Sequence, residues 1–414
     1  MDPSAWRGSA GARGAPHQGV VPSVVIAGAG IGGLACALAF ARRGASAYVL
    51  ERAEAFGAVG AGVQLGPNAV RVLRGLGMSE DALRPWRPEA ASVRDGRTGR
   101  VRLRVPLGDA GERRWGAPYL AVHRADLHEA LRAACAAAGV TVRAGAAVTG
   151  YEQGALLTED GPVAGELIVG ADGARSVIRA RMGAPAPRYT GDAAWRALVR
   201  ADALPESFVG GFGGGALPAE AVSWTGPGRH LVSYAVRSGS LVNVVAVTAR
   251  AWTEEGWSVP GDPSELRAAF AGWHPAVTTL LGATEEVSLW GLFARAPLPR
   301  WSDGAVTLLG DAAHPMLPYL AQGASMALED AWVLAERVTR LGVAPGLRAY
   351  EAARRPRTAR LVRQSQENRA MFHGGAGLTG ALGAAKMRAA RLVPQAALAR
   401  LDAIYGADVT ASAT

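Results

Sequence analysis

Residues 24–51 read VVIAGAGIGGLACALAFARRGASAYVLE, and this stretch decides the fold. Its leading β-formers predict a strand, the Ala/Leu-rich run that follows predicts a helix ending at Gly44, and residues 47–50 predict a second strand. Between the first strand and the helix, glycines 28, 30 and 33 form a Gly-x-Gly-x-x-Gly motif. The second strand ends on Glu51, about twenty residues further on. This order is typical of a β-α-β unit that binds a dinucleotide.

Each part of the stretch suits one contact with such a ligand. Gly28 allows the tight turn, Gly30 lets a pyrophosphate approach the backbone, and Gly33 lets helix and strand pack closely. The helix N-terminus offers N–H groups and partial positive charge to the phosphates, and Glu51 is placed to accept hydrogen bonds from a ribose. The alternative is a structural turn in a chain with 54 glycines, but it leaves the ordered strand, helix and acid unexplained.

Length and composition predict a two-lobed globular chain. The 414 residues are 49% hydrophobic, and no apolar run reaches the length of a membrane-spanning helix. Residues 1–20 lack the apolar core of a signal peptide, so a disordered leader is expected there. The two cysteines, Cys36 and Cys135, suit a reduced, cytoplasmic setting.

The net charge of +9 could indicate nucleic acid as a partner. Only one of the 44 basic residues is a lysine, Lys386, and the arginines are scattered along the chain. An ordinary enzyme surface is therefore the favoured interpretation, with neither nucleic acid nor membrane as a partner.

The pattern of elements predicts an α/β fold with a discontinuous nucleotide domain over 21–185 and 290–345. Residues 186–289 alternate as strands, including 231–237 and 241–248, and predict an inserted β-sheet substrate domain to which 80–120 contribute. Residues 346–414 are expected to be helical. The site is expected between the two lobes. Two local expectations are a glycine-rich loop over 57–66 and, over 90–122, a turn-rich region of low helicity with a hairpin at 101–105.

Two further motifs place an aspartate directly after a short apolar strand. Asp172 lies in VGADGARS (169–176), and Asp311 lies in LGDAAHP (309–315), shortly before a helix that opens at Gly323. Carboxyl ends of parallel strands are where α/β sheets bind ligands. Each aspartate alone is more simply a helix N-cap or Asx turn, but the ordered set of motifs favours function.

The order GAGIGG…ER, ADGARS, GDAAHP…QGASMALEDA resembles the FAD-dependent aromatic hydroxylases of the para-hydroxybenzoate hydroxylase type, over roughly residues 22–375. Within that group, HPMLPYLAQGASMALEDA and YEAARRPRTARLVRQSQENRAMFHG are most similar to 3-hydroxybenzoate 6-hydroxylases, salicylate hydroxylases and 6-hydroxynicotinate 3-monooxygenases. The resemblance implies one non-covalent FAD, NADH or NADPH as transient donor with NADH favoured, and O2. It also implies that a flavin C4a-hydroperoxide hydroxylates a phenolic or amino-substituted aromatic carboxylate.

Residue by residue, the resemblance assigns Arg124 to the FAD phosphates, Asp311 to the ribityl–phosphate region and Asp172 to both FAD and NAD(P)H. Arg196 matches an arginine near the flavin; the alternative is a surface charge on a strand. The full set of expected cofactor contacts is Gly28, Gly30, Ile31, Gly33, Glu51, Arg52, Gly62, Val63, Arg124, Val148, Asp172, Arg196, Asp311, Gly323 and Ala324.

The expected catalytic residues lie outside the nucleotide motifs. His230 and Tyr234 are four apart on one predicted strand and hence on one face, opposite a largely apolar strand. They resemble an H-x-x-x-Y catalytic pair, with His230 as base or proton relay and Tyr234 orienting substrate; a solvated His and a core Tyr are the alternative. Relatives place a polar His or Gln where this chain has Pro318-Tyr319, which makes Tyr319 a third candidate against plain packing.

Other functions stay open at this level. They are an FAD-dependent tailoring oxidoreductase or epoxidase on a larger natural product, a non-catalytic flavin-binding module, and an NAD-dependent dehydrogenase. His314 is expected to be structural beside the Gly-Asp turn. No cluster has metal-ligand spacing, so no metal site is predicted, and the C-terminal helices could pair in a homodimer.

Overall fold

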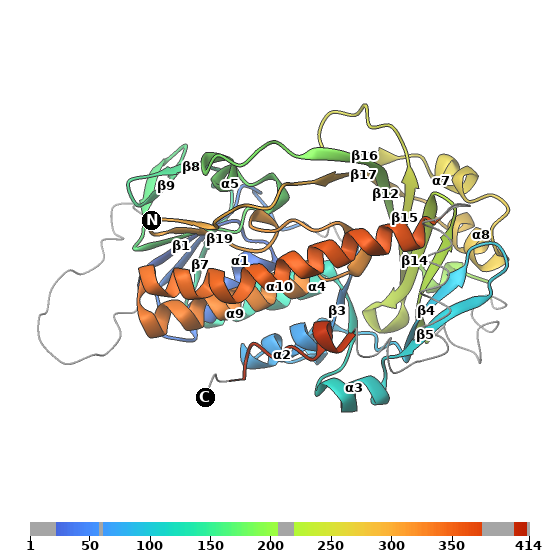
Figure 1. Ribbon diagram of the computed structural model, residues 1–414, viewed down its shortest axis with the longest axis horizontal. Coiled ribbons are helices and arrows are strands. Elements are labelled where there is room, and N and C mark those ends of the chain that lie inside the picture. The colour runs from blue at the N-terminus through green and yellow to red at the C-terminus, as the bar shows by residue number, and fades with distance from the viewer. Residues whose placement is uncertain (1–21, 58–60, 206–218, 375–400, 412–414) are drawn as a thin grey trace, which may run out of the picture.

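The computed structural model describes residues 22–57, 61–205, 219–374 and 401–411. Two sheets of different construction lie at opposite ends of the molecule, and the long helix α10 (Val343–Phe372) runs past the first towards the second (Figure 1). The predicted leader and much of the predicted C-terminal helical region fall outside the described residues.

The first sheet has six strands, and its central strands are parallel. The strand order is β18-β19-β11-β1-β2-β7, with only β18 antiparallel to its neighbour. Its strands are β1 (Val24–Ala27), β2 (Ala47–Leu50), β7 (Thr141–Arg143), β11 (Leu167–Gly170), β18 (Ser302–Asp303) and β19 (Val306–Leu308). Three chain segments distant in sequence thus meet at its centre, so their carboxyl ends share one edge.

The second large sheet has eight strands in the order β16-β17-β12-β15-β14-β13-β4-β5, and only β13 and β4 pair in parallel. Its strands are β4 (Ala90–Asp95), β5 (Val101–Pro106), β12 (Arg188–Arg200), β13 (Glu220–Gly226), β14 (Arg229–Val236), β15 (Leu241–Ala249), β16 (Ser258–Gly261) and β17 (Val287–Ala294). Two small sheets complete the strands: β3 (Gly62–Leu65) with β6 (Leu120–His123), and β8 (Val148–Glu152), β9 (Ala155–Thr158) and β10 (Gly161–Ala164).

Helices cover both sheets. They are α1 (Ile31–Ala41), α2 (Pro67–Gly75), α3 (Asp109–Trp115), α4 (Arg124–Ala137), α5 (Val177–Arg181), α7 (Pro263–Ala269), α8 (Pro275–Gly282), α9 (Gly323–Leu341) and α10. Short 3₁₀ turns are η2 (Asp81–Leu83), η3 (Gly173–Arg175), η4 (Ala201–Ala203), η5 (Arg237–Gly239), η6 (Gly310–Ala312) and η7 (Pro318–Leu320).

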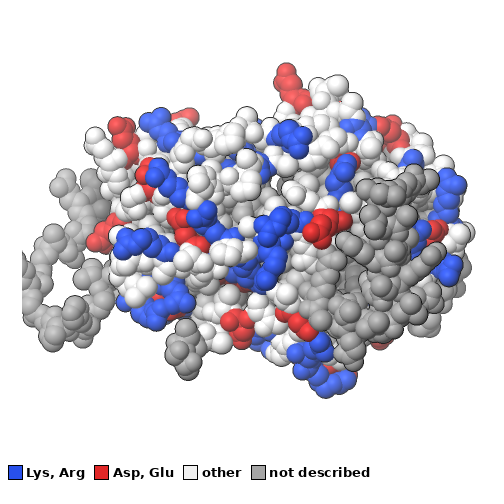
Figure 2. Space-filling view, viewed as in Figure 1, with Lys and Arg blue, Asp and Glu red and all other residues white. Residues whose placement is uncertain are grey.

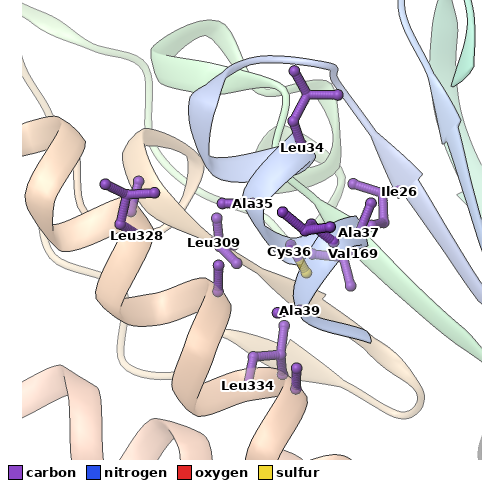
Figure 3. Close-up of a cluster of buried hydrophobic side chains, with 14 of the residues drawn as sticks. Ile26, Leu34, Ala35, Cys36, Ala37, Ala39, Val169, Leu309, Leu328 and Leu334 are labelled. Carbon is purple, nitrogen blue, oxygen red and sulfur yellow. The ribbon is translucent and has the colours of Figure 1, made fainter. Parts of the chain in front are cut away.

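The first core forms around α1, whose residues from Gly33 to Phe40 are all buried. Figure 3 shows Ala35 and Ala39 of α1 beside Leu328 and Leu334 of α9. Small alanine side chains let two helices approach closely, while each fully buried leucine contributes about 1.5–3 kcal/mol. The packing therefore fixes α9, and with it the helix start at Gly323, against the nucleotide-binding unit.

A buried ion network ties α9 to α10. Arg354 donates to Glu329 and Asp330, each at 2.6 Å, and all three side chains are at most 1% exposed. His314 Nε2 lies 2.5 Å from the Asp330 carboxylate, which also accepts from the backbone N–H of Gly310 at 3.1 Å. These contacts give His314 the structural position expected for it, because they anchor the loop that carries Asp311.

Two local expectations were wrong. Part of the expected glycine-rich loop, residues 62–65, is strand β3, because its backbone pairs with β6. The region expected to have low helicity contains α3, whose first turn carries Asp109 and Glu112 and whose last turn carries two arginines, charges that favour a helix. The expected hairpin at 101–105 is present as β4 and β5.

Acidic and basic side chains alternate on the surface. Figure 2 shows arginines over the middle of one face with acidic side chains beside them. Several form exposed pairs, such as Arg132 with Glu129 and Arg200 with Asp202. Among the described residues, no helix is both long enough and apolar enough to cross a membrane.

Candidate functional site

One cavity of about 530 Å³ joins the glycine loop after β1 to the eight-stranded sheet. Most of the predicted site residues line it: Gly30, Ile31, Gly62, Val63, Arg124, Arg196, His230, Tyr234, Asp311, Tyr319, Gly323 and Ala324. They come from segments far apart in the chain, which include the loop after β1, strands β12 and β14 of the eight-stranded sheet, and the turns and helix start that follow β19. The folded chain therefore brings the nucleotide motifs and the candidate catalytic residues onto a single continuous wall.

The glycine loop has the geometry that a dinucleotide needs. Gly28 has φ +100°, and a Cβ at Gly33 would lie 1.9 Å from the Gly28 carbonyl oxygen, so both positions require glycine. A Cβ at Gly30 would meet nothing within 4 Å, which leaves open space at the point of pyrophosphate approach. Glu51 lies beside the loop and accepts a hydrogen bond from the backbone N–H of Ala29 at 2.8 Å.

Two helices present their N-termini without a side-chain cap. No described side chain caps α1 or α9, and neither helix has an acidic residue in its first turn. Helix N-termini carry unsatisfied N–H groups and partial positive charge, so such ends suit an anion or a developing negative charge. Because Gly30 and Gly323 both line the cavity, the two helix starts face the same space.

Charged side chains meet in the middle of the cavity. Asp311 lines the cavity and its carboxylate is reached only from there. Burial raises the pKa of this carboxyl, while the charges of His314, Arg124 and Arg196 oppose that rise. The Arg196 guanidinium lies over the Trp290 ring, 4.9 Å from its centroid, and burial lowers its pKa. This clustering argues against the surface-charge alternative for Arg196.

Two polar groups of the wall have no hydrogen-bond partner among the described residues. They are Arg196 Nε and Gln322 Nε2. The amide oxygen of Gln322 accepts from Asn68 at 3.2 Å, so its remaining N–H groups are left for the cavity. Buried donors are normally satisfied, so unpaired ones in a cavity wall indicate a missing polar ligand. With the open loop and the free helix starts, the residues present fit FAD.

Some predicted cofactor residues lie away from the cavity surface. Gly28, Gly33 and Glu51 do not line the cavity, Arg52 is exposed, and Val148 packs against the first core. The Asp172 carboxylate accepts from the backbone N–H of Val177, the first residue of α5, at 2.7 Å, while its other oxygen is buried without a described partner. The contacts predicted for these residues stay predictions.

His230 and Tyr234 share the cavity face of β14, as their spacing predicted. Leu231, between them, points instead into the core behind the sheet. Both titratable side chains are buried, at 2% and 5% exposure, which removes the solvated-histidine alternative. Burial raises the pKa of Tyr234, and Gln64 and Arg196 act against that rise.

His230 has a partner that the sequence did not indicate. Its Nδ1 lies 2.8 Å from Nε2 of His373, at the end of α10. Burial, and then the charge of His373, hold the pKa of His230 well below its usual value of 6.5. Burial likewise lowers the pKa of His373 to about 4. Both imidazoles are therefore neutral near pH 7.

The Tyr319 hydroxyl donates to the carboxylate of Asp192 at 2.6 Å. Asp192 is fully buried on β12 and also accepts from Arg369 of α10 at 3.0 Å. Burial and then Asp192 raise the pKa of Tyr319. Its ring lies 5.4 Å from that of His230. Tyr319 thus offers the cavity an aromatic face, while its hydroxyl is held by Asp192.

Sequence reasoning also missed Asn243 and Gln64. Asn243 is fully buried on the strand expected to be an apolar wall, and its side chain accepts from the Gly62 backbone N–H at 2.6 Å. Gln64 accepts from Tyr119. An isolated amide in an apolar strand was the available signal for Asn243, and His373 lay within a stretch already similar to known hydroxylases.

Comparisons with known proteins agree with this geometry. A family model described as an FAD binding domain matches residues 22–365. The 3-amino-4-hydroxybenzoate 2-monooxygenase of Streptomyces platensis is 41% identical over 373 residues, covering 85% of this chain and 89% of that protein. The 6-hydroxynicotinate 3-monooxygenase of Bordetella bronchiseptica is 39% identical over 360 residues, covering 84% and 91%. A salicylate hydroxylase substrate complex has a TM-score of 0.75 at 25% identity, covering 94% and 96%.

The chain therefore belongs to the FAD-binding family of class A flavin hydroxylases. It is an FAD-dependent aromatic monooxygenase, and NAD(P)H is the electron donor typical of that family. The predicted fold class, cofactor and enzyme class are confirmed, and the dehydrogenase alternative was wrong.

Proposed function

We propose that this enzyme hydroxylates a small aromatic carboxylate that carries a hydroxyl or amino group. The observation that carries the proposal is the single cavity that runs from the dinucleotide loop to His230 and Tyr234. The names of two relatives support it, because each describes oxidation of a hydroxylated aromatic acid. NADH or NADPH and O2 complete the reaction.

The cofactor's place follows from the cavity wall. The loop at Gly30 and the start of α1 would hold the pyrophosphate, and Asp311 would hold hydroxyls of the ribityl chain. The start of α9 at Gly323 would lie beside the flavin ring. When bound, FAD accepts a hydride from the nicotinamide and then enables O2 to supply an electrophilic oxygen.

His230 acts as the base toward the substrate. An aromatic ring attacks an electrophilic oxygen faster when its hydroxyl loses a proton, because the negative charge spreads into the ring. His230 is neutral near pH 7 and lines the cavity, so it can accept that proton. Tyr234 remains protonated and can donate a hydrogen bond that orients the substrate.

The part of the cavity next to the eight-stranded sheet has an apolar lining that excludes water. Its apolar lining includes Val93, Leu103, Val105, Val232, Val245, Leu317 and Phe372. Water in the site would let activated oxygen be lost before it attacks the aromatic ring. An apolar wall that excludes water therefore favours coupling of NAD(P)H oxidation to product formation. Ser223 and Asn368 also line the cavity and can donate hydrogen bonds to a carboxylate.

A panel of aromatic acids tests the proposal. Hydroxybenzoates, aminohydroxybenzoates and hydroxynicotinates should each be supplied with NADH and with NADPH. We expect at least one to stimulate nicotinamide oxidation and to give a product heavier by one oxygen atom, and His230→Ala to lower that rate. No stimulation by any acid in the panel would contradict the proposal, whereas turnover of a larger polycyclic phenol alone would favour the natural-product alternative.

A further inference from the structure

We infer that His373 carries the substrate's proton from His230 to solvent. This inference rests on the proposed function, because it supplies the exit for the proton that His230 removes. His230 is only 2% exposed, so its side chain cannot exchange protons directly with bulk water. A buried base needs either a second group or a water chain to release its proton between turnovers.

The geometry of the two rings suits a relay. His230 Nδ1 and His373 Nε2 are 2.8 Å apart, which is hydrogen-bond distance, and the ring centroids are 5.0 Å apart. Because Nδ1 is used in this contact, Nε2 is the nitrogen that remains for the substrate. His373 is the C-cap residue of α10 and is only half-buried, so its side chain can contact both His230 and solvent.

Two charged groups near His373 act in opposite directions on a transient positive charge there. Asp192 of β12 attracts the imidazolium, while Arg369 of α10 opposes it. Arg369 donates to both oxygens of Asp192, so part of that attraction is already neutralised. The Tyr319 ring of η7 lies 5.8 Å away, edge-on, and its proton stays in the bond to Asp192. His373 can therefore bind the proton briefly and release it again, as a relay requires.

The proton moves in three balanced transfers. The substrate O–H bond breaks, its electron pair stays on oxygen, and the proton binds Nε2 of His230. The proton on Nδ1 of His230 then passes to Nε2 of His373. Finally, the proton on Nδ1 of His373 passes to water. The reverse sequence protonates the product and restores the tautomers, so no further reactant is consumed.

The test measures proton transfer separately from turnover. Stopped-flow absorbance follows phenolate formation when a substrate that the wild type hydroxylates is mixed with the FAD-loaded enzyme, in wild type, His373→Ala and His373→Gln. A positioned acid–base group contributes about 10²–10⁴-fold. We expect phenolate formation and product formation to slow by roughly 10²-fold in both variants, and added imidazole to restore much of the rate in His373→Ala.

Arg369→Gln is the matched control for a structural role. It removes a contact that fixes the end of α10 but leaves both imidazoles in place, so imidazole should not change its rate. If His373→Ala loses FAD, His373→Gln decides the question, since it keeps side-chain volume and polarity. Wild-type rates of phenolate formation in the folded variants, or no imidazole rescue of folded His373→Ala, would overturn the relay. Failure of the wild type to hydroxylate any aromatic acid would instead overturn the proposed function.

Discussion

Gly30 and Gly33 stand three residues apart in one loop, yet they demand glycine for different reasons. A Cβ at Gly33 would overlap the Gly28 carbonyl oxygen at 1.9 Å, whereas a Cβ at Gly30 would enter open space with a backbone φ of −69° that alanine adopts. The fold therefore requires glycine at position 33, whereas a requirement for glycine at position 30 would come from the proposed pyrophosphate contact.

Alanine at each position should separate these requirements. We expect Gly33→Ala to lower the free energy of unfolding of the FAD-free protein by about 1–3 kcal/mol or more, because backbone must move. Gly30→Ala should leave that stability within about 0.5 kcal/mol and weaken FAD binding. Thermal unfolding and fluorescence titration with FAD measure the two effects. Equal FAD affinity in Gly30→Ala and wild type would contradict the assignment.

The histidine pair predicts a pH dependence of stability. The folded state holds the pKa of His373 at about 4 and that of His230 well below 6.5, so between these values the unfolded chain binds more protons. Stability should therefore fall as pH drops from about 6.5 towards 4. Melting temperatures measured across this range should fall less in His373→Gln than in wild type. An equal fall in melting temperature in wild type and His373→Gln would contradict the claim that folding holds the two histidines neutral.

Sequence reasoning reached some of these residues and not others, for a physical reason. The glycines, Glu51 and the His230–Tyr234 pair follow rules of local spacing, in a turn or on one face of a strand. His373 and Asp192 act through partners 143 and 177 residues away in sequence, respectively His230 and Arg369. Such contacts depend on how α10 crosses the second sheet, which no local pattern encodes.

Among the elements, α10 links the nucleotide-binding unit to the substrate side. Near its middle, Arg354 enters the ion network with α9, and near its end Arg369 pairs with Asp192 on β12. The turn η7 lies between these contacts, where Ser365 donates to the Leu317 carbonyl at 2.7 Å and Asn368 to the Tyr319 carbonyl at 3.1 Å. The helix end therefore fixes one wall of the cavity.

Asp192→Asn should weaken this docking. Removing one charge from a buried pair costs about 3–5 kcal/mol, and the partial exposure of Arg369 reduces the expected loss to about 1–3 kcal/mol. We expect chemical denaturation to show this loss and the KM for the aromatic substrate to rise. Asp202→Asn is the matched control, because its pair with Arg200 is fully exposed and its loss should leave the stability unchanged within the error of the measurement. Equal effects of both substitutions would count against the docking role.

Elements with a strong local signal were predictable, whereas those set by pairing were not. The β1–α1–β2 unit and both long helices follow from hydrophobic periodicity and end signals. Strand β3 was missed because its glycine-rich sequence has little strand propensity, and its pairing with β6 decides its conformation. The predicted domain boundaries stay predictions. Strands β4 and β5 belong to the eight-stranded sheet although they lie outside the predicted central segment, residues 186–289.

At the scale of the whole molecule, one cavity lies between the two large sheets. In the proposed function, the helix starts and Asp311 beside the parallel sheet would hold the cofactor, and His230, Tyr234 and apolar side chains of the second sheet would face the substrate. Neither sheet alone encloses the cavity. A homodimer through the C-terminal helices stays a prediction, which light scattering after size-exclusion chromatography checks.

Isotope labelling tests the central claim most directly. The FAD-loaded enzyme is supplied with NADH or NADPH and a substrate from the panel under ¹⁸O2, and the product is analysed by mass spectrometry. We predict that one ¹⁸O atom enters the product, with close to one nicotinamide oxidised for each product formed. Product containing oxygen from water, or nicotinamide oxidation that yields only hydrogen peroxide with every aromatic acid tested, would contradict the account.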